Sequence, residues 1–277
     1  MDRNRLTITL KKDILKQLDD YIDGSRIRNR SHAIEYVLSK HFAPKIKKAV
    51  ILAGGKGLKM RPFTYEMPKA MIPVNGRPVL EHIIENLRHY DIRGLVVSIG
   101  HQGSKIKQHF GDGSKFGVKI TYLDQGKSES GTAAPILQAK KLVASQPFLV
   151  YYGDVLATID LDDLVDFHLA NNAVVTLALT SVNKSADWGV VRVQGNRVYS
   201  FLEKPEARKD LSNVINAGIY IFEPAIFDYL ADAKRLEKDV FPKLVEQRKL
   251  FGYLFAGQWF DVGNPEIYKQ AVKEWKG

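Results

Sequence analysis

A glycine-rich stretch between residues 49 and 73 gathers side chains that could bind a polyphosphate. It opens with the apolar run 49–53, typical of a buried parallel strand, and passes into Gly54, Gly55 and Gly57. Glycine tolerates positive φ, so such a backbone can curl and direct consecutive N–H groups at an anion. The same stretch carries four cations: Lys56, Lys59, Arg61 and Lys69. One triphosphate could engage several of them, and we therefore predict a nucleotide site here.

The spacing fits neither G-x-x-x-x-G-K-S/T nor G-x-G-x-x-G. Residues 52–64 resemble instead the signature L-A-G-G-x-G-T-R-L-x-P-L-T of the sugar-1-phosphate nucleotidyltransferases, and residues 68–74 resemble the P-K-P/A-M/L-x-P-V that follows it. Leu58 replaces the usual Thr, and Lys59 replaces the family's catalytic Arg, which keeps the charge but loses the bidentate geometry. The alternative is a strand followed by an ordinary basic loop. The resemblance implies catalytic roles for Lys59 and Lys69, and nucleotide contacts from Leu52, Ala53, Gly54, Gly55 and Gly57.

Two carboxylates lie in segments that also resemble this family. Asp154 lies at the end of the apolar strand predicted over 148–155, and Asp261 lies within G-Q-W-F-D-V-G-N-P, where Asn264 replaces the usual Thr. The resemblance implies that both aspartates hold Mg²⁺, an ion that favours carboxylates together with phosphate oxygens. A lone Asp in a strand-end turn is more often structural, so the metal role depends on the two residues meeting in the fold.

Further segments resemble the parts of the family that bind the base and the sugar phosphate. The loop 125–134 resembles the one beside the nucleobase, which implies contacts from Gly131 and Thr132, although Thr132 could simply cap a helix. The segments W-G-V-V, F-L-E-K-P and N-A-G-I-Y imply sugar-phosphate contacts. The residues concerned are Gly189, Glu203, Lys204 and Asn216.

The elements that would position these residues alternate between strand and helix over residues 45–277. Helical periodicity at 78–90, 104–110 and 133–143 separates apolar strands at 94–99 and 118–123. This pattern predicts an α/β fold with a doubly wound, mixed and mostly parallel sheet, a Rossmann-like nucleotidyltransferase core by the resemblance. Ligands of such sheets bind at the carboxyl ends of the strands, where the glycine loop lies.

Residues 1–44 form a separate, basic segment, since residues 1–48 hold 12 Lys/Arg and 6 Asp/Glu. Alternation over 4–11 predicts a strand, and apolar stripes at 14–22 and 33–42 predict two helices, too little to close a core alone. The segment resembles the ribbon-helix-helix DNA-binding module, which implies a homodimer. The alternative is a dimerisation handle that does not bind DNA. By the resemblance, the DNA contacts would come from Arg5, Thr7, Thr9, Arg28 and Arg30.

The chain has 277 residues, a formal charge of +10, no cysteine and no run long enough to span a bilayer, so we expect a cytoplasmic protein without a membrane partner. By the resemblance, it transfers a nucleotidyl group from an NTP to a hexose-1-phosphate with Mg²⁺. The run 236–242 most resembles mannose-1-phosphate guanylyltransferases and favours GTP with mannose-1-phosphate. A second hypothesis is a transcriptional regulator whose degenerate nucleotidyltransferase domain senses a nucleotide or NDP-sugar; a third is an active enzyme that represses its own genes.

Overall fold

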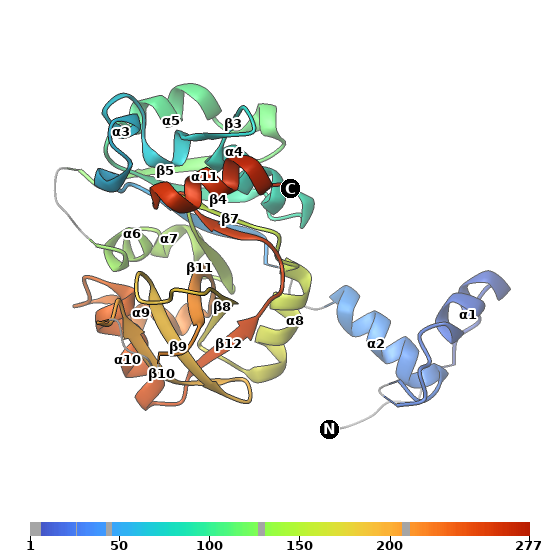
Figure 1. Ribbon diagram of the computed structural model, residues 1–277. Coiled ribbons are helices and arrows are strands. Elements are labelled where there is room, and N and C mark those ends of the chain that lie inside the picture. The colour runs from blue at the N-terminus through green and yellow to red at the C-terminus, as the bar shows by residue number, and fades with distance from the viewer. Residues whose placement is uncertain (1–6, 26, 43–45, 127–130, 207–210) are drawn as a thin grey trace. The chain divides into compact units, whose positions relative to one another are not determined.

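The computed structural model describes residues 7–25, 27–42, 46–126, 131–206 and 211–277 (Figure 1). The chain divides into two compact units, residues 1–45 and residues 46–277. Among the described residues, no helix is long and apolar enough to cross a membrane.

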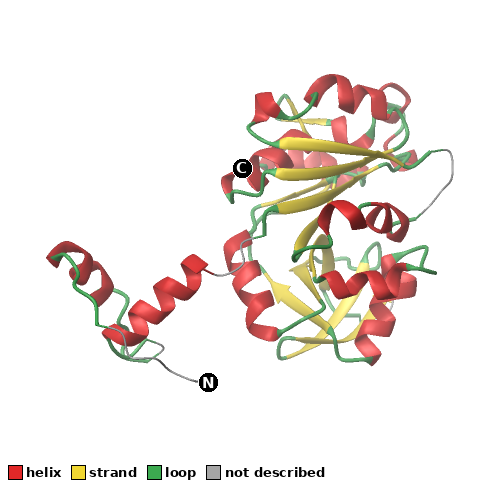
Figure 2. Ribbon diagram, turned by 180° about the vertical axis from the view of Figure 1, so that it is seen from behind, coloured by secondary structure: helices red, strands yellow, loops and turns green. Residues whose placement is uncertain are grey.

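The larger unit is built on one nine-stranded sheet with the order β5-β4-β1-β6-β11-β8-β12-β10-β9, and two small ribbons, β7-β13 and β2-β3, lie beside it. Its strands are β1 (Lys48–Ala53), β2 (Pro73–Val74), β3 (Arg77–Pro78), β4 (Gly94–Ile99), β5 (Lys119–Asp124), β6 (Phe148–Tyr152), β7 (Val155–Ala157), β8 (Val175–Ser181), β9 (Gly189–Gln194), β10 (Arg197–Glu203), β11 (Val214–Phe222), β12 (Leu250–Leu254) and β13 (Trp259–Asp261). Figure 2 shows the sheet with helices on both of its faces.

The helices cover both faces of this sheet. Those of the larger unit are α3 (Phe63–Glu66), α4 (Val79–His89), α5 (Gly103–Phe110), α6 (Ala133–Gln138), α7 (Lys140–Val143), α8 (Leu161–Asn171), α9 (Phe227–Leu230), α10 (Phe241–Glu246) and α11 (Pro265–Glu274). Side chains of α4, α5, α8 and α11 join one apolar cluster, and those of α6, α7, α9 and α10 join the other. In β1, Ile51 belongs to the first cluster and Val50 to the second. The strand is therefore buried on both faces, which explains its continuous apolar run.

The sheet is mixed, as predicted, but "mostly parallel" is wrong for the sheet as a whole. Strands β5, β4, β1 and β6 are parallel to one another, and β12 is parallel to β8. The pairs β6–β11, β11–β8, β9–β11, β10–β12 and β10–β9 are antiparallel. Only the half that carries the glycine loop is the parallel, doubly wound arrangement that strand–helix alternation predicts.

The smaller unit contains α1 (Lys12–Asp19) and α2 (Arg30–Phe42), in agreement with the two predicted helices. Asn29 caps α2, because its Oδ1 accepts from His32 N at 2.9 Å. Leu18, Ile27 and Ala33 form the small apolar core of this unit.

The strand predicted over residues 4–11 is not present in its described part, residues 7–11, so the ribbon-helix-helix assignment is not supported by this chain alone. A ribbon strand has no hydrogen-bond partner within a single copy of this segment, which is the physical reason for the difference. Residues 1–6 and 43–45 lie outside the described residues.

Candidate active site

The glycine loop follows β1 at the carboxyl edge of the parallel strands, and its shape is fixed by close packing. Gly57 has φ of 61°, and its carbonyl accepts from Thr64 Oγ1 at 2.8 Å. A Cβ on Gly57 would lie 2.7 Å from Thr64 Cγ2, and a Cβ on Gly54 would overlap the amide of Gln125. Gly57 therefore favours glycine because its backbone is left-handed, whereas a side chain at Gly54 would have to displace the end of the Gln125 side chain.

Two adjoining cavities open at this edge of the sheet. The first, of about 890 Å³, is lined by the glycine loop and by Gln125 and Gly126. The second, of about 390 Å³, is lined by Gly189, Glu203 and Asn216. Residues that line both cavities mark where they meet: Lys69, Gly131, Thr132, Tyr152, Asp154, Lys204 and Arg235. The predicted nucleotide and sugar residues thus occupy neighbouring chambers.

One cation and two carboxylates converge where the chambers meet. Asp154 follows β6, and Asp261 is brought beside it because β13 pairs with β7. Lys69 forms an ion pair with Asp154. A Cβ placed on Gly263 would lie 2.8 Å from Lys69 Nζ, 2.9 Å from Asp261 Oδ1 and 3.1 Å from Asp154 Oδ2. The three side chains therefore surround a single point, and a side chain at Gly263 would have to displace their ends.

Hydrogen bonds hold Asp261 in place. Trp188 Nε1 donates to its Oδ2 at 2.9 Å, and Gly263 N donates to its Oδ1 at 2.8 Å. Burial raises the pKa of Asp261, the nearby Asp154 raises it further, and Lys69 opposes both. Burial lowers the pKa of Lys69, but Asp154 and Asp261 together outweigh burial, so that its pKa is raised and the amine stays charged. The cluster thus has two acidic groups and one basic group. Its acidic groups outnumber its basic group, so a bound cation would be stabilised there.

The sugar-side chamber presents Glu203 at its wall. Burial raises the pKa of Glu203, and the neighbouring Glu237 raises it further. A Cβ on Gly189 would lie 2.6 Å from Phe201 Cζ and 3.1 Å from Glu203 Oε2, so glycine leaves space for this carboxylate. Lys204 is exposed beside it, at 4.0 Å from Glu203 Oε1. Carboxylate and ammonium together can accept from sugar hydroxyls and neutralise a phosphate.

Asn216 and Gly218 also line the sugar-side chamber. Asn216 Nδ2 donates to Tyr220 Oη at 2.8 Å, and its Oδ1 accepts from Gly218 N at 3.0 Å. The register of β11 against β8 shifts between Asn216 and Tyr220, and Gly218 has φ of 78° within this irregularity. The amide of Asn216 is therefore held in one orientation, with one N–H still available for a ligand.

Comparison with known proteins finds relatives of the larger unit. The protein family described as "Nucleotidyl transferase" matches residues 48–276. The chain belongs to this family. A UTP–glucose-1-phosphate uridylyltransferase of Synechocystis sp. is 35% identical over 242 residues, which cover 82% of this chain and 62% of that protein. A mannose-1-phosphate guanylyltransferase of Mycobacterium tuberculosis is 35% identical over 225 residues, which cover 79% of this chain and 62% of that protein. This nucleotidyl transferase chain therefore spans less than two thirds of the length of these relatives.

Solved structures agree on the fold. A UDP-glucose pyrophosphorylase in complex with UDP-glucose superposes with a TM-score of 0.73 at 21% identity, over 83% of this chain and 98% of that one. HddC from Yersinia pseudotuberculosis superposes with a TM-score of 0.72 at 24% identity, over 83% and 100% of the two chains. These likenesses establish the Rossmann-like nucleotidyltransferase fold of the larger unit.

Glu237, Tyr152 and Gln125 line the site of this nucleotidyl transferase but were not predicted from the sequence. Glu237 is 8% exposed in the π-helical turn Leu236–Val240, and it accepts from Thr132 Oγ1 at 2.9 Å and from the Tyr152 hydroxyl. Leu236 N in turn donates to Thr132 Oγ1 at 2.9 Å. The side chain of Thr132 does not cap α6. Its hydroxyl instead joins the loop 125–134, here called the base-side loop, to the turn 236–240 through hydrogen bonds. In the sequence the run 236–242 indicates only a substrate class, and nothing in it shows that Glu237 is buried.

The structure does not bring every predicted site residue to the cavities. Lys59 is exposed in the short 3₁₀ turn Leu58–Met60 and lines neither chamber, so its catalytic role stays a prediction. In the smaller unit, Thr7, Thr9 and Arg28 are exposed, and Arg5 lies outside the described residues. Arg30 instead donates to both carboxylate oxygens of Asp19, at 2.7 and 2.8 Å.

Replacing Gly189 with Ala is expected to raise KM for the sugar phosphate about tenfold, because the added methyl group would displace the Phe201 ring, at 2.6 Å, and press on the Glu203 carboxylate, at 3.1 Å. The KM for the nucleotide should change little, since Gly189 lines only the sugar-side chamber. Steady-state kinetics with each substrate varied in turn would measure both values. Val193→Ala, on the same strand but 38% exposed, is the matched control. Equal changes in both KM values would contradict this placement of Gly189.

Proposed function

We propose that this nucleotidyl transferase moves a nucleotidyl group from an NTP to a hexose-1-phosphate, giving an NDP-sugar and pyrophosphate. The observation that carries the proposal is the convergence of Lys69, Asp154 and Asp261 at the junction of two chambers. One chamber has a glycine loop suited to phosphates, and the other has Glu203 and Lys204 suited to a sugar phosphate. The reacting phosphorus would then lie between them, at the charged cluster.

The reaction needs alignment and charge neutralisation rather than a general base. A sugar-phosphate oxygen is already anionic; it attacks the α-phosphorus of the NTP as the bond to the pyrophosphate oxygen breaks. Lys69 donates to the phosphate oxygens on which charge develops, and Lys204 neutralises the sugar phosphate. Glu203 orients the sugar through its hydroxyl groups, and the buried pair Glu237 and Thr132 holds the base-side loop in register.

Asp154 and Asp261 are suited to hold Mg²⁺. Carboxylate oxygens from both reach one point, and among the described residues no third His or acidic side chain joins them in a metal-binding group. Mg²⁺ commonly takes one or two protein carboxylates and completes its coordination with substrate phosphates and water. When bound, the ion would neutralise charge on the phosphates that face the cluster. Removal of Mg²⁺ by a chelator is expected to stop turnover.

For the substrates, we propose GTP and mannose-1-phosphate. The run 236–242 supports this pair, and several relatives of 30–35% identity are named as mannose-1-phosphate guanylyltransferases. The base-side candidate Gln125 offers both a donor and an acceptor, and its Nε2 donates to Ser98 Oγ at 2.8 Å. Such an amide can pair with guanine or uracil, so UTP with glucose-1-phosphate, as named for the Synechocystis relative, is the second candidate.

The test is pyrophosphate release with Mg²⁺ from GTP, UTP, dTTP, ATP and CTP against mannose-, glucose-, galactose- and N-acetylglucosamine-1-phosphate. We expect turnover with GTP and mannose-1-phosphate above all other pairs. Turnover with another pair would keep the reaction and change the substrates. Tight nucleotide binding without turnover by any pair would overturn the enzymatic proposal in favour of the nucleotide sensor.

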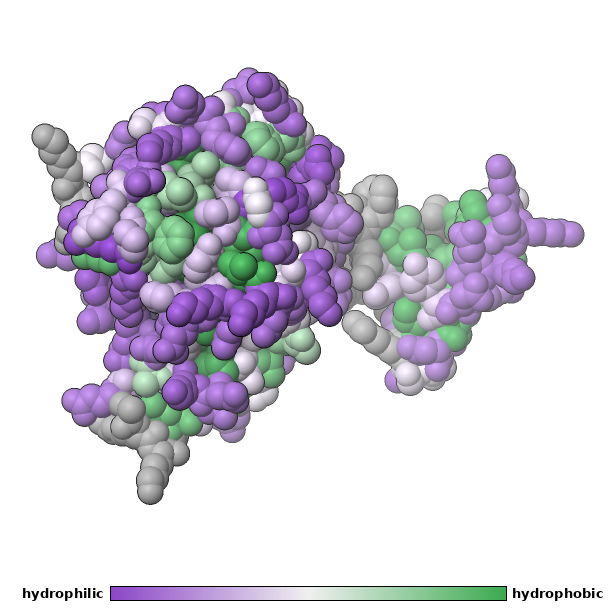
Figure 3. Space-filling view, turned by 45° about the horizontal axis from the view of Figure 1, so that its top comes forward, coloured by the Kyte–Doolittle hydropathy of each residue, from purple (hydrophilic) through white to green (hydrophobic). Residues whose placement is uncertain are grey.

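For the smaller unit, we propose homodimer formation through its apolar surface, with DNA as a candidate partner. Ile8, Ile14, Tyr21 and Leu38 are each 42–50% exposed on a unit whose described core has three residues. On the face seen in Figure 3, its apolar side chains gather on one side and its charged side chains on the other. A second copy would bury this apolar side and supply the partner that the residue 7–11 segment needs to form a strand. For Arg30 to bind a phosphate, its exposed ion pair with Asp19 would have to open, at a cost of about 0–1 kcal/mol.

Deleting residues 1–45 is expected to convert a dimer into a monomer, as measured by light scattering after size exclusion. Ile14→Glu in the full chain should do the same, and Lys12→Glu in the same helix is the control. A dimeric 46–277 fragment would contradict the proposed interface. DNA affinity, if phosphate contacts carry it, should fall steeply between low and moderate salt.

A further inference from the structure

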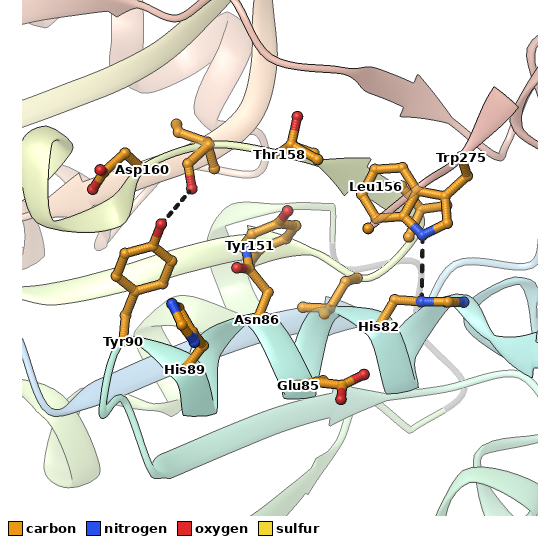
Figure 4. A pocket seen from close by; sticks show the side chains of 14 residues that line it. His82, Glu85, Asn86, His89, Tyr90, Tyr151, Leu156, Thr158, Asp160 and Trp275 are labelled. Carbon is orange, nitrogen blue, oxygen red and sulfur yellow. Dashed lines mark hydrogen bonds between the residues drawn. The ribbon is translucent and has the colours of Figure 1, made fainter.

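The cations that line cavities of the larger unit gather at the candidate active site. The cavity of about 400 Å³ between α4 and the segment after β7 has no Lys or Arg among the described residues that line it (Figure 4). The two chambers of the active site are lined by Lys56, Lys69, Lys204 and Arg235. The last three line both chambers and so lie where the two substrates would meet. The proposed reaction assigns phosphates to Lys69 and Lys204 and leaves Arg235 without a role.

The guanidinium of Arg235 has no hydrogen-bond or ion-pair partner in the part of the chain that the structure describes. By contrast, Lys69 forms an ion pair with Asp154, and Lys204 Nζ lies 4.0 Å from Glu203 Oε1. Burial raises the pKa of Glu203, and Arg235 is one of the cations that oppose this rise without pairing with the carboxylate. The five N–H donors of Arg235 are therefore available to a ligand of the chambers.

Arg235 lies immediately before the π-helical turn Leu236–Val240, and neighbouring elements fix its backbone and stem. Asp239 Oδ2 accepts from Arg235 N and from Lys234 N, both at 2.8 Å. A Cβ on Gly131 would lie 2.1 Å from Lys234 O and 3.3 Å from Arg235 Cγ, so the stem lies against this glycine. Because Gly131 also lines both chambers, the guanidinium extends from their shared wall.

The chemistry at this junction favours phosphate oxygens as the ligand. The sugar phosphate and the α-phosphoryl group of the NTP are both anionic, and they must approach each other for the reaction. Lys69 alone offsets little of that repulsion, since Asp154 and Asp261 already face its charge. A guanidinium stays protonated, and its planar fork matches the oxygens of a phosphate.

We propose that Arg235 is a catalytic residue whose guanidinium binds oxygens of the sugar phosphate and of the α-phosphoryl group during transfer. This inference rests on the proposed function. As the sugar-phosphate oxygen bonds to the α-phosphorus, the bond from that phosphorus to the pyrophosphate oxygen breaks, and its electron pair leaves with pyrophosphate. Arg235 keeps its protons and neutralises charge. It supplies the planar fork that Lys59 lacks, and from the chamber wall, which Lys59 does not line.

Arg235→Gln is expected to lower kcat/KM for the sugar phosphate about a hundredfold. Arg235→Lys, which keeps the charge but not the fork, should lose about tenfold. Lys234→Gln is the matched control, because Lys234 is the neighbouring exposed cation, its N–H donates to the same Asp239 oxygen, and it lines neither chamber. Its kinetics should equal those of the wild type. All three variants should keep the wild-type melting temperature, since both side chains are exposed.

Added guanidinium distinguishes a phosphate contact from a structural role. In Arg235→Ala, the space left by the side chain opens to solvent, so guanidinium chloride at millimolar concentration should restore part of the lost turnover. Sodium chloride at the same concentration controls for ionic strength. Equal effects of the two salts, or no recovery with guanidinium, would count against the contact.

Binding measurements separate this inference from the proposed reaction. Calorimetry with mannose-1-phosphate and with glucose-1-phosphate, each without nucleotide, should show binding about tenfold weaker in Arg235→Gln than in the wild type. If the wild type turns over no substrate pair but this difference is found, the reaction is wrong and the contact stands. If the wild type turns over while Arg235→Gln keeps its kcat/KM and its affinity, the contact is wrong and the reaction stands. A wild type that binds neither compound would overturn both.

Discussion

Replacing Asp261 with Asn is expected to lower kcat/KM about a thousandfold and to abolish its dependence on Mg²⁺. The substitution is isosteric but leaves one side-chain oxygen, so either Trp188 Nε1 or Gly263 N keeps its acceptor and the other donor loses it. What is also lost is one of the two negative charges of the proposed Mg²⁺ site. Because Asp261 is buried beside Lys69, the remaining carboxylate would be neutralised by that lysine and would attract a metal ion poorly.

Pyrophosphate release over a range of Mg²⁺ concentrations measures this effect. Asp228→Asn is the matched control, since Asp228 is an exposed carboxylate on α9 and lines neither chamber. An Asp261→Asn variant that keeps more than about a tenth of the wild-type rate would remove Asp261 from the metal site. Melting temperatures of both variants should stay close to that of the wild type, which shows that the change is not in folding.

Replacing Lys69 with Met is expected to lower kcat by about 10²–10³, but with a different Mg²⁺ response. Met keeps much of the apolar stem and removes the charge that donates to the phosphates. It also leaves Asp154 and Asp261 without the cation that now lies between them. Mg²⁺ should therefore bind the free Lys69→Met protein at least as tightly as the wild type, while turnover falls.

Calorimetric titration of Mg²⁺ together with kcat distinguishes Lys69 from the carboxylates. Lys115→Met, at an exposed lysine away from both chambers, controls for the general loss of charge. Parallel loss of Mg²⁺ binding and turnover in Lys69→Met would mean that the lysine only maintains the structure of the cluster. Unchanged turnover would assign the phosphate contact to another cation, of which Lys56 and Arg235 line the first chamber.

The parallel half of the sheet was predictable because strands buried on both faces appear in the sequence as continuous apolar runs. The predicted strand 94–99 matches β4, and the predicted helices match α4 and α5 to within one residue at each end. The predicted helix 133–143 is broken at Ala139 into α6 and α7. The antiparallel half was not predicted, since pairings such as β6 with β11 join segments far apart in the chain and leave no local periodicity.

The residue types and spacing of the glycine loop were enough to predict a phosphate site there. They did not show which residues from distant parts of the chain would join that site. Asp154 and Asp261 come together through the β7–β13 ribbon, and only the family resemblance implied that they do. Glu237 was missed because a single acidic residue in a helical run is usually on a solvated surface; its burial depends on Thr132 and Tyr152. The dimer predicted for residues 1–44 requires a second chain, so its strand has no partner within one copy.

The β7–β13 ribbon also sets the order in which the site can mature during synthesis. Chains grow from the N-terminus, so the glycine loop, Lys69 and Asp154 emerge well before β13 is made. A nascent chain of that length could hold a nucleotide, yet its lysine would face only one carboxylate. Pairing of β13 with β7 adds Asp261 and Gly263 together. We therefore expect chains that end before β13 to lack turnover, since they lack Asp261 and also the core residues Phe260, Val262 and Ala271.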